Sequence, residues 1–565
     1  PGIESFKWFA DGRRIVFAAW GFAGARTAQA QAQALKADKD DKATGVATSE
    51  AFHRYWDHDM PRGRRLQLWL LDADTGRITP LTAGSALELP RTNDGNGSYD
   101  VRPDGRRVCV VFDPADEPRL GNPLALAEVD VATRRVVRRA VVPGWELDAP
   151  AYSPDGRRLA CLAANTGAAH TALARPALVA ADGTLEPLCP GWDRHVDSRL
   201  LWAADGQGLR FAAEDRGRRH LWRLPLQAAE PTVEQAGDWV QGFDAAGDTL
   251  LWLADSARHP AQVWARAGGA APRRIERFND ERMAGLALGE VRELQVAGAG
   301  GEPVQVWLTF PPGFDAKKKH AVLHMIHGGP FAAAGDSFGW RWNPHVFAAP
   351  EPGATGDPGR VVVQVNYHGS SGFGHAFRHS LIGRQGELEL QDIEAATDWL
   401  CTQRWADRDR IVASGGSYGG FLVAWMNGHV PAWPQGRYRA YVCHAGVFDR
   451  ISTFSADSWP VRPLDLGAEY WVDMPRVLAQ SPHAFAARMA TPTLVIHGAR
   501  DYRVPDANGL AYFHTLKSRG VPARLLWFAD ENHWVLKPAN SLQWHREFRA
   551  WVAQHTTPVK ARRRA

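Results

Sequence analysis

Cysteine is scarce in this chain, and the few copies form no pattern. Only five of the 565 residues are cysteines. Their spacing matches neither a paired disulfide framework nor a metal-binding cluster. The sequence therefore predicts no metal site, and it leaves the redox compartment open.

Long apolar runs and an excess of charge are also missing. No run approaches the roughly 18 residues of a membrane-spanning helix, so no membrane span is expected. The net charge of +4 is small for this length and implies no nucleic-acid partner. The basic residues at 560–564 are interpreted as part of a solvated tail at 558–565. With 45% hydrophobic and 23% charged residues, the composition is that of a globular protein with two or more domains.

A repeated Asp-Gly turn organises the first half of the chain. Copies lie at 8–17, 101–112 and 152–162, with looser copies at 202–211 and 243–252. Each turn is followed by a short apolar run typical of a strand. The spacing is 51 residues from Asp104 to Asp155 and 50 from Asp155 to Asp205. A period of this size, built from strands and turns, predicts the blades of a β-propeller.

Five blades are predicted, the first of them interrupted by an insertion at 24–62. Residues 28–39 within the insertion have high helix propensity and predict an exposed helix. A closed propeller of this kind has more blades, and the chain begins without Met or a leader sequence. We therefore expect the propeller at 1–285 to be incomplete at its amino end, with one or two blades preceding residue 1.

Near residue 290 the pattern changes to strands that alternate with helices. Apolar strand-like runs lie at 321–326, 361–365, 411–414, 441–444 and 493–496, and helical stretches at 389–403 and 507–519. This alternation predicts a mostly parallel, doubly wound sheet with helices on both faces, over 290–557.

The sequence GGSYGG at 415–420 lies between a predicted strand and a predicted helix. Gly-x-Ser-x-Gly in that position is typical of a nucleophile elbow, a sharp turn that exposes the serine hydroxyl. The helix that follows favours developing negative charge at its amino end. Ser417 is therefore the candidate nucleophile, since a plain glycine turn explains the pattern but not its position.

A catalytic serine needs a base and a group that orients the base. In this order of elements the acid follows the serine, and the histidine follows the acid. Asp501 comes directly after the buried-strand pattern at 492–498, and His533 after the strand pattern at 523–528. We expect Asp501 and His533 to complete a triad with Ser417. The fallback acids are Asp506 and Asp530.

The oxyanion needs hydrogen-bond donors that are already in place. The backbone amide of Tyr418 follows the nucleophile directly and is one candidate. The second should come from a loop after an earlier strand, where HGGP stands at 327–330. The Gly329 amide is the candidate there.

These motifs resemble the prolyl oligopeptidase family of serine peptidases. The matching pieces are HGGPF at 327–331, NYHGSSGFG at 366–374, GGSYGG at 415–420, HGARDYRVP at 497–505 and DENHWVLKP at 530–538. Residues 340–344, 531–541 and HRYWD at 53–57 are similar to the dipeptidyl-peptidase V and acylaminoacyl-peptidase branch. The resemblance implies a β-propeller followed by an α/β-hydrolase domain, with Ser417, Asp501 and His533 as triad and Gly329 and Tyr418 as oxyanion donors.

The resemblance also implies a function. We expect hydrolysis of oligopeptides with release of amino-terminal dipeptides, no metal or organic cofactor, and a propeller that limits access. Family position suggests an S1 pocket, for the side chain before the cleaved bond, formed by Val447, Phe448, Phe454 and Val504. Carboxylates for the substrate amino group are sought at Glu50, Asp57 and Asp59, or at Glu146.

Three other functions stay open at this point. An acylaminoacyl-peptidase would require a blocked amino terminus, a carboxylesterase would share the triad, and a binding module would sit on an inactive hydrolase. Homo-oligomers are common in the branch. The likeness favours a periplasmic or secreted location, and a cytoplasmic one stays open.

Overall fold

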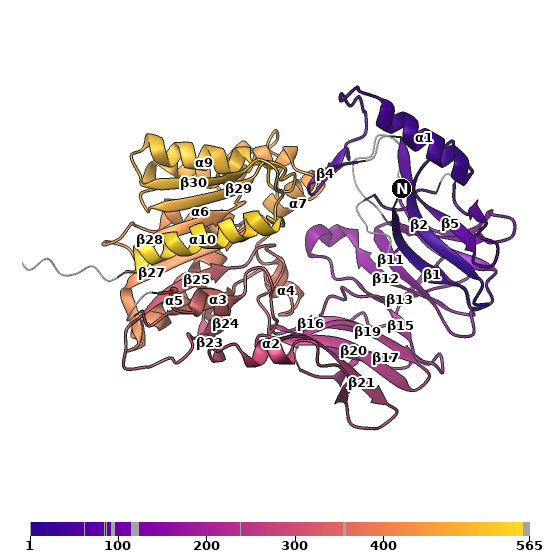
Figure 1. Ribbon diagram of the computed structural model, residues 1–565, viewed down its shortest axis with the longest axis horizontal. Helices are drawn as coiled ribbons and strands as arrows, with labels where there is room; N and C mark the ends of the chain where they lie inside the picture. Colours follow the sequence, from indigo (N-terminus) through magenta and orange to yellow (C-terminus); the bar gives the residue numbers. More distant parts are fainter. Residues whose placement is uncertain are drawn as a thin grey trace, which may run out of the picture.

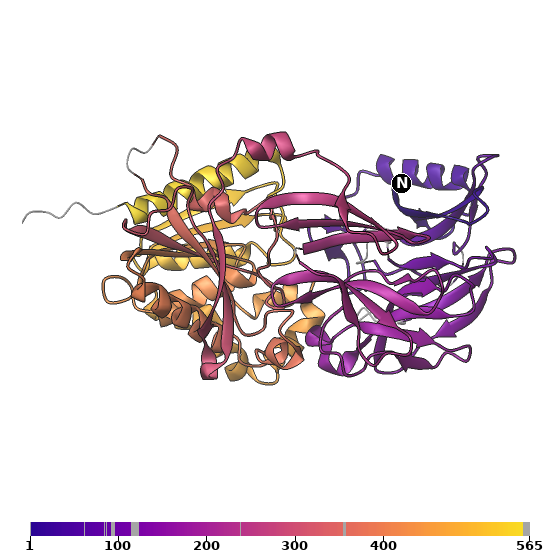
Figure 2. The same cartoon turned by 90° about the horizontal axis from the view of Figure 1, so that it is seen from below.

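The computed structural model describes residues 2–60, 63–83, 85, 87–91, 97–114, 124–237, 239–353 and 357–557. The expected basic tail at 558–565 lies outside them. An all-β half (indigo to magenta) lies beside an α/β half (red to yellow) in both views (Figures 1 and 2). Within the described residues, no helix combines the length and the apolar character that crossing a membrane requires.

Antiparallel four-stranded units follow one another along the all-β half. The first has β1 (Ile3–Trp8), β2 (Arg14–Phe22), β5 (Arg64–Asp72) and β6 (Ile78–Pro80). The second has β7 (Tyr99–Val101), β8 (Arg107–Phe112), β9 (Ala125–Asp130) and β10 (Val136–Ala140), and the third has β11 (Trp145–Tyr152), β12 (Leu159–Asn165), β13 (Arg175–Val179) and β14 (Leu185–Pro187).

The fourth and fifth units are joined into one sheet by a single parallel pair, Arg219 with Trp239. They consist of β15 (Leu201–Trp202), β16 (Gly208–Asp215), β17 (Arg218–Pro225) and β18 (Thr232–Gln235), then β19 (Trp239–Ala246), β20 (Thr249–Ser256), β21 (His259–Ala267) and β22 (Arg273–Arg274). The described residues thus hold five four-stranded units, as many as the predicted blades. Their closure into a ring stays a prediction.

The repeated Asp-Gly turns connect the first two strands of the units. Asp104 and Gly105 lie between β7 and β8, and Gly105 has a φ of +66°. Glycine tolerates this left-handed conformation without a steric penalty, which explains the Asp-Gly sequence at the turn.

The insertion in the first unit holds α1 (Ala28–Asp40) and a short hairpin of β3 (Arg54–Tyr55) and β4 (His58–Asp59). Thr27 caps the amino end of α1 by accepting a hydrogen bond from the Ala30 amide, as helix start signals favour. The helix expected at 28–39 is confirmed. The hairpin reaches the α/β half near α7 (Figure 1).

The α/β half contains an eight-stranded sheet in the order β23-β24-β26-β25-β27-β28-β29-β30. Its strands are β23 (Val291–Ala297), β24 (Pro303–Thr309), β25 (His320–Ile326), β26 (Arg360–Asn366), β27 (Ala406–Gly416), β28 (Tyr438–His444), β29 (Thr493–Gly498) and β30 (Ala523–Phe528). Only β23 and β24 pair antiparallel to their neighbours, so the expected mostly parallel sheet is confirmed.

Helices cover both faces of this sheet. Val322 packs into a core with α5 (Leu388–Thr402), α6 (Tyr418–His429) and α9 (Ala507–Ser518), whereas the next residue, Leu323, packs with α3 (Pro344–Ala348) and α10 (Pro538–Thr556). Successive side chains of a strand point to opposite faces, so a central strand such as β25 contributes to both cores. The short helices are α2 (Asp280–Ala284), α4 (His375–His379), α7 (Arg462–Leu466) and α8 (Met474–Leu478), with 3₁₀ helices at Thr166–Thr171, Ala299–Gly301, Ser452–Ser455, Trp459–Val461 and Pro482–Arg488.

Candidate active site between the two halves

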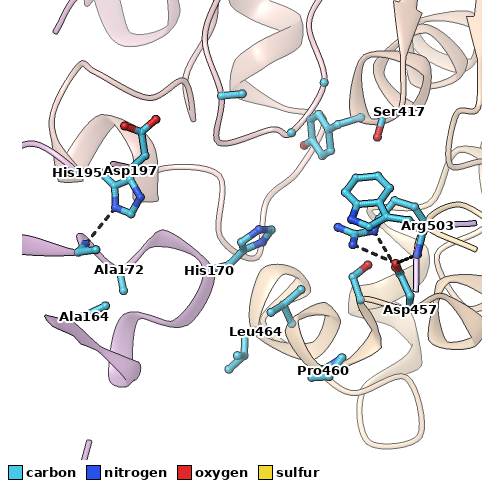
Figure 3. A pocket seen from close by; sticks show the side chains of 18 of the residues that line it. Ala164, His170, Ala172, His195, Asp197, Ser417, Asp457, Pro460, Leu464 and Arg503 are labelled. Carbon is cyan, nitrogen blue, oxygen red and sulfur yellow. Dashed lines mark hydrogen bonds and ion pairs between the residues drawn. The ribbon is translucent and has the colours of Figure 1, made fainter. Parts of the chain in front are cut away.

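A cavity of about 1280 Å³ lies between the two halves and is lined by both. Figure 3 shows Ser417, Asp457 and Arg503 of the α/β half on one side, with His195 and Asp197 of the all-β half on the other. Tyr418, Gly329 and His533 line the same cavity. The structure therefore brings the predicted nucleophile, base and oxyanion donors to one cavity.

Ser417 stands at the turn between β27 and α6 with a φ of +59° and a ψ of −117°. A serine in this region is strained, and such strain persists only where the surroundings enforce it. The neighbouring backbones do so, because a Cβ on Gly415 would lie 2.2 Å from Gly419 O, and one on Gly419 would lie 2.2 Å from Ile326 O. The glycines of GGSYGG are thus required by close approach of backbone, as a nucleophile elbow demands.

His533 and Asp501 form a buried pair at the ends of two neighbouring strands. His533 Nδ1 donates to Asp501 Oδ2 over 2.6 Å, and both residues are 2% exposed. The Arg503 and Val504 amides donate to the other carboxylate oxygen, at 3.0 and 2.8 Å. Burial by itself raises the pKa of Asp501, but the facing His533 and the hydrogen bonds from His497 and His533 hold it well below its ordinary value.

Ser417 Oγ and the His533 ring both reach the cavity without a hydrogen bond between them in the described structure. In ligand-free enzymes such contacts are often long and tighten only when substrate is bound. The arrangement supplies a nucleophile, a cavity-lining base whose Nδ1 is bound to the acid, and an ionised acid behind the base.

The two other histidines that end strands hold backbone in place. His444 O accepts from the Ser417 amide at 2.9 Å, and His444 Nε2 donates to His533 O at 3.0 Å. Burial lowers the pKa of His444 to about 3, so it stays neutral. His497 Nε2 donates to Val504 O at 2.8 Å. Both histidines therefore fix the loops that carry the triad.

The fallback acids lie away from His533. Asp530 pairs with Lys537 at the surface. Asp506 accepts a hydrogen bond from Trp527 Nε1 at 3.2 Å.

The loop after β25 approaches the nucleophile closely. A Cβ on Gly328 would lie 3.2 Å from Ser417 Cβ, and Gly329 has a φ of +120° that favours glycine. His327 stacks on Tyr367 with ring centroids 4.2 Å apart, and Tyr367 Oη donates to His327 O at 2.8 Å. These contacts hold the Gly329 amide beside the cavity.

A buried polar cluster behind Tyr418 was not foreseen from the sequence. Tyr418 Oη donates to Glu389 Oε1 over 2.6 Å, and the Gly386 amide donates to the same oxygen. Burial raises the pKa of Glu389 to about 7. The Arg450 guanidinium stacks over Phe421 at 3.8 Å. No local motif indicates the cluster, because Glu389 lies on α5, 29 residues before Tyr418, and meets it only through helix packing.

The four residues expected in the S1 pocket fall into two groups. Val447 and Val504 line the cavity. Phe448 is buried against Tyr512 with ring centroids 4.9 Å apart, and Phe454 contacts Tyr470 and does not line the cavity.

Of the carboxylates expected to bind a substrate amino group, only one lines the cavity. Glu50 pairs with Arg91, Asp57 accepts from Asn532 at 2.6 Å, and Asp59 is exposed on β4. Glu146 lies on β11 and lines the cavity together with Asp148. Burial raises the pKa of Glu146 and the Asp148 carboxylate raises it further, while no described side chain donates to Glu146.

Comparison with known proteins decides the family. The sequence pattern of the prolyl oligopeptidase family matches residues 339–558. Dipeptidyl-peptidase 5 of Schizosaccharomyces pombe is 30% identical over 541 residues, which cover 90% of this chain and 75% of that protein. The chain belongs to the prolyl oligopeptidase family.

A bacterial relative agrees with this result. Dipeptidyl-peptidase 5 of Porphyromonas gingivalis is 27% identical over 579 residues, covering 98% of this chain and 80% of that protein. The expected membership of the prolyl oligopeptidase family of serine peptidases is confirmed.

Solved structures show the shared fold. The acylaminoacyl peptidase of Pyrococcus horikoshii aligns with a TM-score of 0.79 and 18% identity, over 99% of this chain and 83% of that one. A puromycin-hydrolysing peptidase of Mycobacterium tuberculosis aligns with a TM-score of 0.70 and 18% identity, over 98% of this chain and 78% of that one. At this identity the likeness supports the two-part architecture alone.

Proposed function

We propose that this chain is a serine peptidase that releases dipeptides from the amino end of oligopeptides. The observation that carries the proposal is the buried hydrogen bond of 2.6 Å between His533 and Asp501, together with the position of His533 in the cavity that Ser417 also lines. Relatives named dipeptidyl-peptidase 5 in a fungus and a bacterium support the substrate class.

Acylation begins when Ser417 Oγ attacks the carbonyl carbon of the second substrate residue. His533 takes the hydroxyl proton, and Asp501 orients the imidazole and stabilises the imidazolium that forms. The Gly329 and Tyr418 amides donate to the developing oxyanion. His533 then gives its proton to the leaving amine, and water hydrolyses the acyl-enzyme by the reverse sequence.

The proposal places an apolar S1 pocket in the part of this cavity beside the nucleophile. Val447, Val504 and Tyr418 line the cavity and are the proposed walls of this pocket. Apolar walls favour apolar side chains through burial, so we expect a small or medium apolar residue before the cleaved bond.

Glu146 is the proposed partner of the free amino group. It faces the cavity from the all-β half and has no described cation or donor. A substrate ammonium placed there would compensate both its burial and the repulsion from Asp148. Since the carboxylate lies on the opposite half from Ser417, it would also fix where along the peptide the serine attacks.

Four matched substrates test the proposal: a dipeptide anilide with a free amino group, its acetylated twin, an acetylated single amino acid anilide, and a simple ester. We expect the free dipeptide anilide to be cleaved and acetylation to abolish cleavage. Hydrolysis of the ester alone would contradict a peptidase.

An acylaminoacyl-peptidase is the second candidate, supported by the Pyrococcus horikoshii fold likeness. It predicts preference for the acetylated amino acid, with the same triad. Limited access through the propeller, a homo-oligomer and a periplasmic or secreted location stay predictions.

A further inference from the structure

The tip of the β3–β4 hairpin touches both loops that carry the proposed acid and base. This hairpin belongs to the insertion in the all-β half, yet the Trp56 amide donates to Asp457 Oδ2 at 2.8 Å. The Tyr502 amide donates to Trp56 O at 2.9 Å. Asn532 Nδ2 donates to Asp57 Oδ2 at 2.6 Å. Both backbone groups of Trp56 are thus satisfied from the other half of the molecule.

Trp56 is held in an unfavourable conformation. Its φ is +55°, which is a steric outlier for a bulky side chain. Such a conformation persists where surrounding contacts determine it, and outliers of this kind gather at functional sites.

The indole of Trp56 packs among residues next to the catalytic pair. Its ring centroid is 5.8 Å from that of His533 and 5.3 Å from that of Trp534. The Arg503 guanidinium stacks over it at 3.8 Å. Trp56, Trp534 and Trp342 all line the cavity (the neighbourhood of Arg503 and Asp457 is seen in Figure 3).

The chemistry of the proposed function indicates which part of the substrate lies on this side of the cavity. During acylation His533 must give a proton to the leaving amine, so that nitrogen comes within hydrogen-bond reach of the imidazole. The residue that begins with this nitrogen, P1′, therefore lies beside His533. A cavity-lining ring packed on His533 stands where the P1′ side chain must fit.

We propose that Trp56 forms a wall of the S1′ subsite and selects a large apolar side chain at P1′, with Trp534 and Trp342 as the other walls. This inference rests on the proposed function. Indole rings bury large apolar area with little loss of side-chain freedom, and they contact aromatic side chains favourably. The all-β half would thereby contribute directly to specificity on the leaving-group side of the bond.

The test compares three substrates with the same free dipeptide: one followed by Phe, one followed by Gly, and the dipeptide methyl ester, which has no P1′ residue. The ratio of kcat/KM for the Phe and Gly peptides is measured in each variant, so the amount of folded enzyme cancels. We expect Trp56→Ala to lower this ratio about ten-fold, and Trp56→Phe to keep most of it. The methyl ester should change about two-fold at most.

Trp471→Ala is the matched control, because Trp471 is 61% exposed and does not line the cavity. Its ratio should equal that of the native chain. An equal loss on all three substrates in Trp56→Ala, or a selective loss in Trp471→Ala, would overturn the S1′ assignment. If the native chain hydrolyses the ester and neither peptide, the peptidase function itself fails and the subsite with it.

Discussion

The two halves of the molecule differ in how the groups proposed to act at the cavity are supported by the rest of the protein. In the α/β half the groups that orient the nucleophile and the base have their partners within the protein: Asp501 accepts from His533 and from two amides, and His444 connects the Ser417 turn to the His533 loop. The all-β half instead presents Glu146 to the cavity without a described donor, and extends Trp56 on a strained turn.

This difference separates two tasks. A catalytic group must be held in one geometry before the substrate arrives, so its hydrogen bonds are made within the protein. A recognition group that has no partner within the protein destabilises it while it is buried and unpaired. Binding of a substrate that supplies the partner removes this cost, and so favours that substrate. The α/β half thus carries the proposed chemistry, and the all-β half carries the proposed selection.

The largest effect is expected from Ser417→Ala. Loss of the nucleophile should reduce kcat by about 10⁶ and abolish covalent labelling by a fluorophosphonate. Ser455→Ala, an exposed serine of the same half, is the control and should label fully. Retained labelling of Ser417→Ala would place the nucleophile elsewhere.

Replacing the acid should come next. Asp501→Asn removes the charge that stabilises the imidazolium and favours the wrong tautomer of His533, so kcat should fall by about 10⁴. Asp530→Asn, at the surface pair with Lys537, should stay within about two-fold. Steady-state kinetics on a dipeptide anilide decide the matter, and similar losses in both variants would refute the assignment of Asp501.

Glu146→Gln tests whether the all-β half binds the substrate amino group. Removing the carboxylate should cost about 2 kcal/mol with a free dipeptide anilide, or about thirty-fold in kcat/KM. The acetylated twin should hardly respond, because it has no ammonium to bind. Asp59→Asn serves as control on an exposed carboxylate of the same half. An unchanged preference for free over acetylated substrate in Glu146→Gln would show that the amino group binds elsewhere.

The last effect is on stability and not on catalysis, and it concerns the α/β half. Burial raises the pKa of Glu389 from 4.5 to about 7, so the fold favours its protonated form. This stabilisation is complete below about pH 4.5 and is lost as the pH rises through 7.

Glu389→Gln should therefore flatten the fall in unfolding temperature between pH 5 and pH 8, and be more stable than the native chain by about 3 kcal/mol at the upper end. Calorimetry at both values gives the slopes, and parallel slopes would contradict a raised pKa for Glu389.

The local sequence predicted those parts of the molecule whose backbone conformation depends on residues nearby in the chain. The GGSYGG turn, the Asp-Gly turns and the helix at 28–39 follow from backbone requirements visible within a few residues. Asp501 and His533 were placed by their positions at strand ends, because parallel strands bring those ends to one edge of the sheet.

The remaining features depend on contacts across the chain. Glu389 meets Tyr418 only because α5 packs on α6, and Trp56 meets His533 across more than 400 positions of sequence. Phe448 occupies a site suggested by family position, yet its ring packs on Tyr512. The direction of a side chain after a turn depends on tertiary packing that no local pattern carries.

The most direct measurement is the identity of the first product released from an unlabelled hexapeptide with a free amino terminus and an apolar second residue. Mass spectrometry of early time points should show the amino-terminal dipeptide and the complementary tetrapeptide, with no product from an acetylated copy. Release of single residues, cleavage at an internal bond independent of acetylation, or preferential cleavage of the acetylated copy would contradict a dipeptidyl-peptidase built from these two halves.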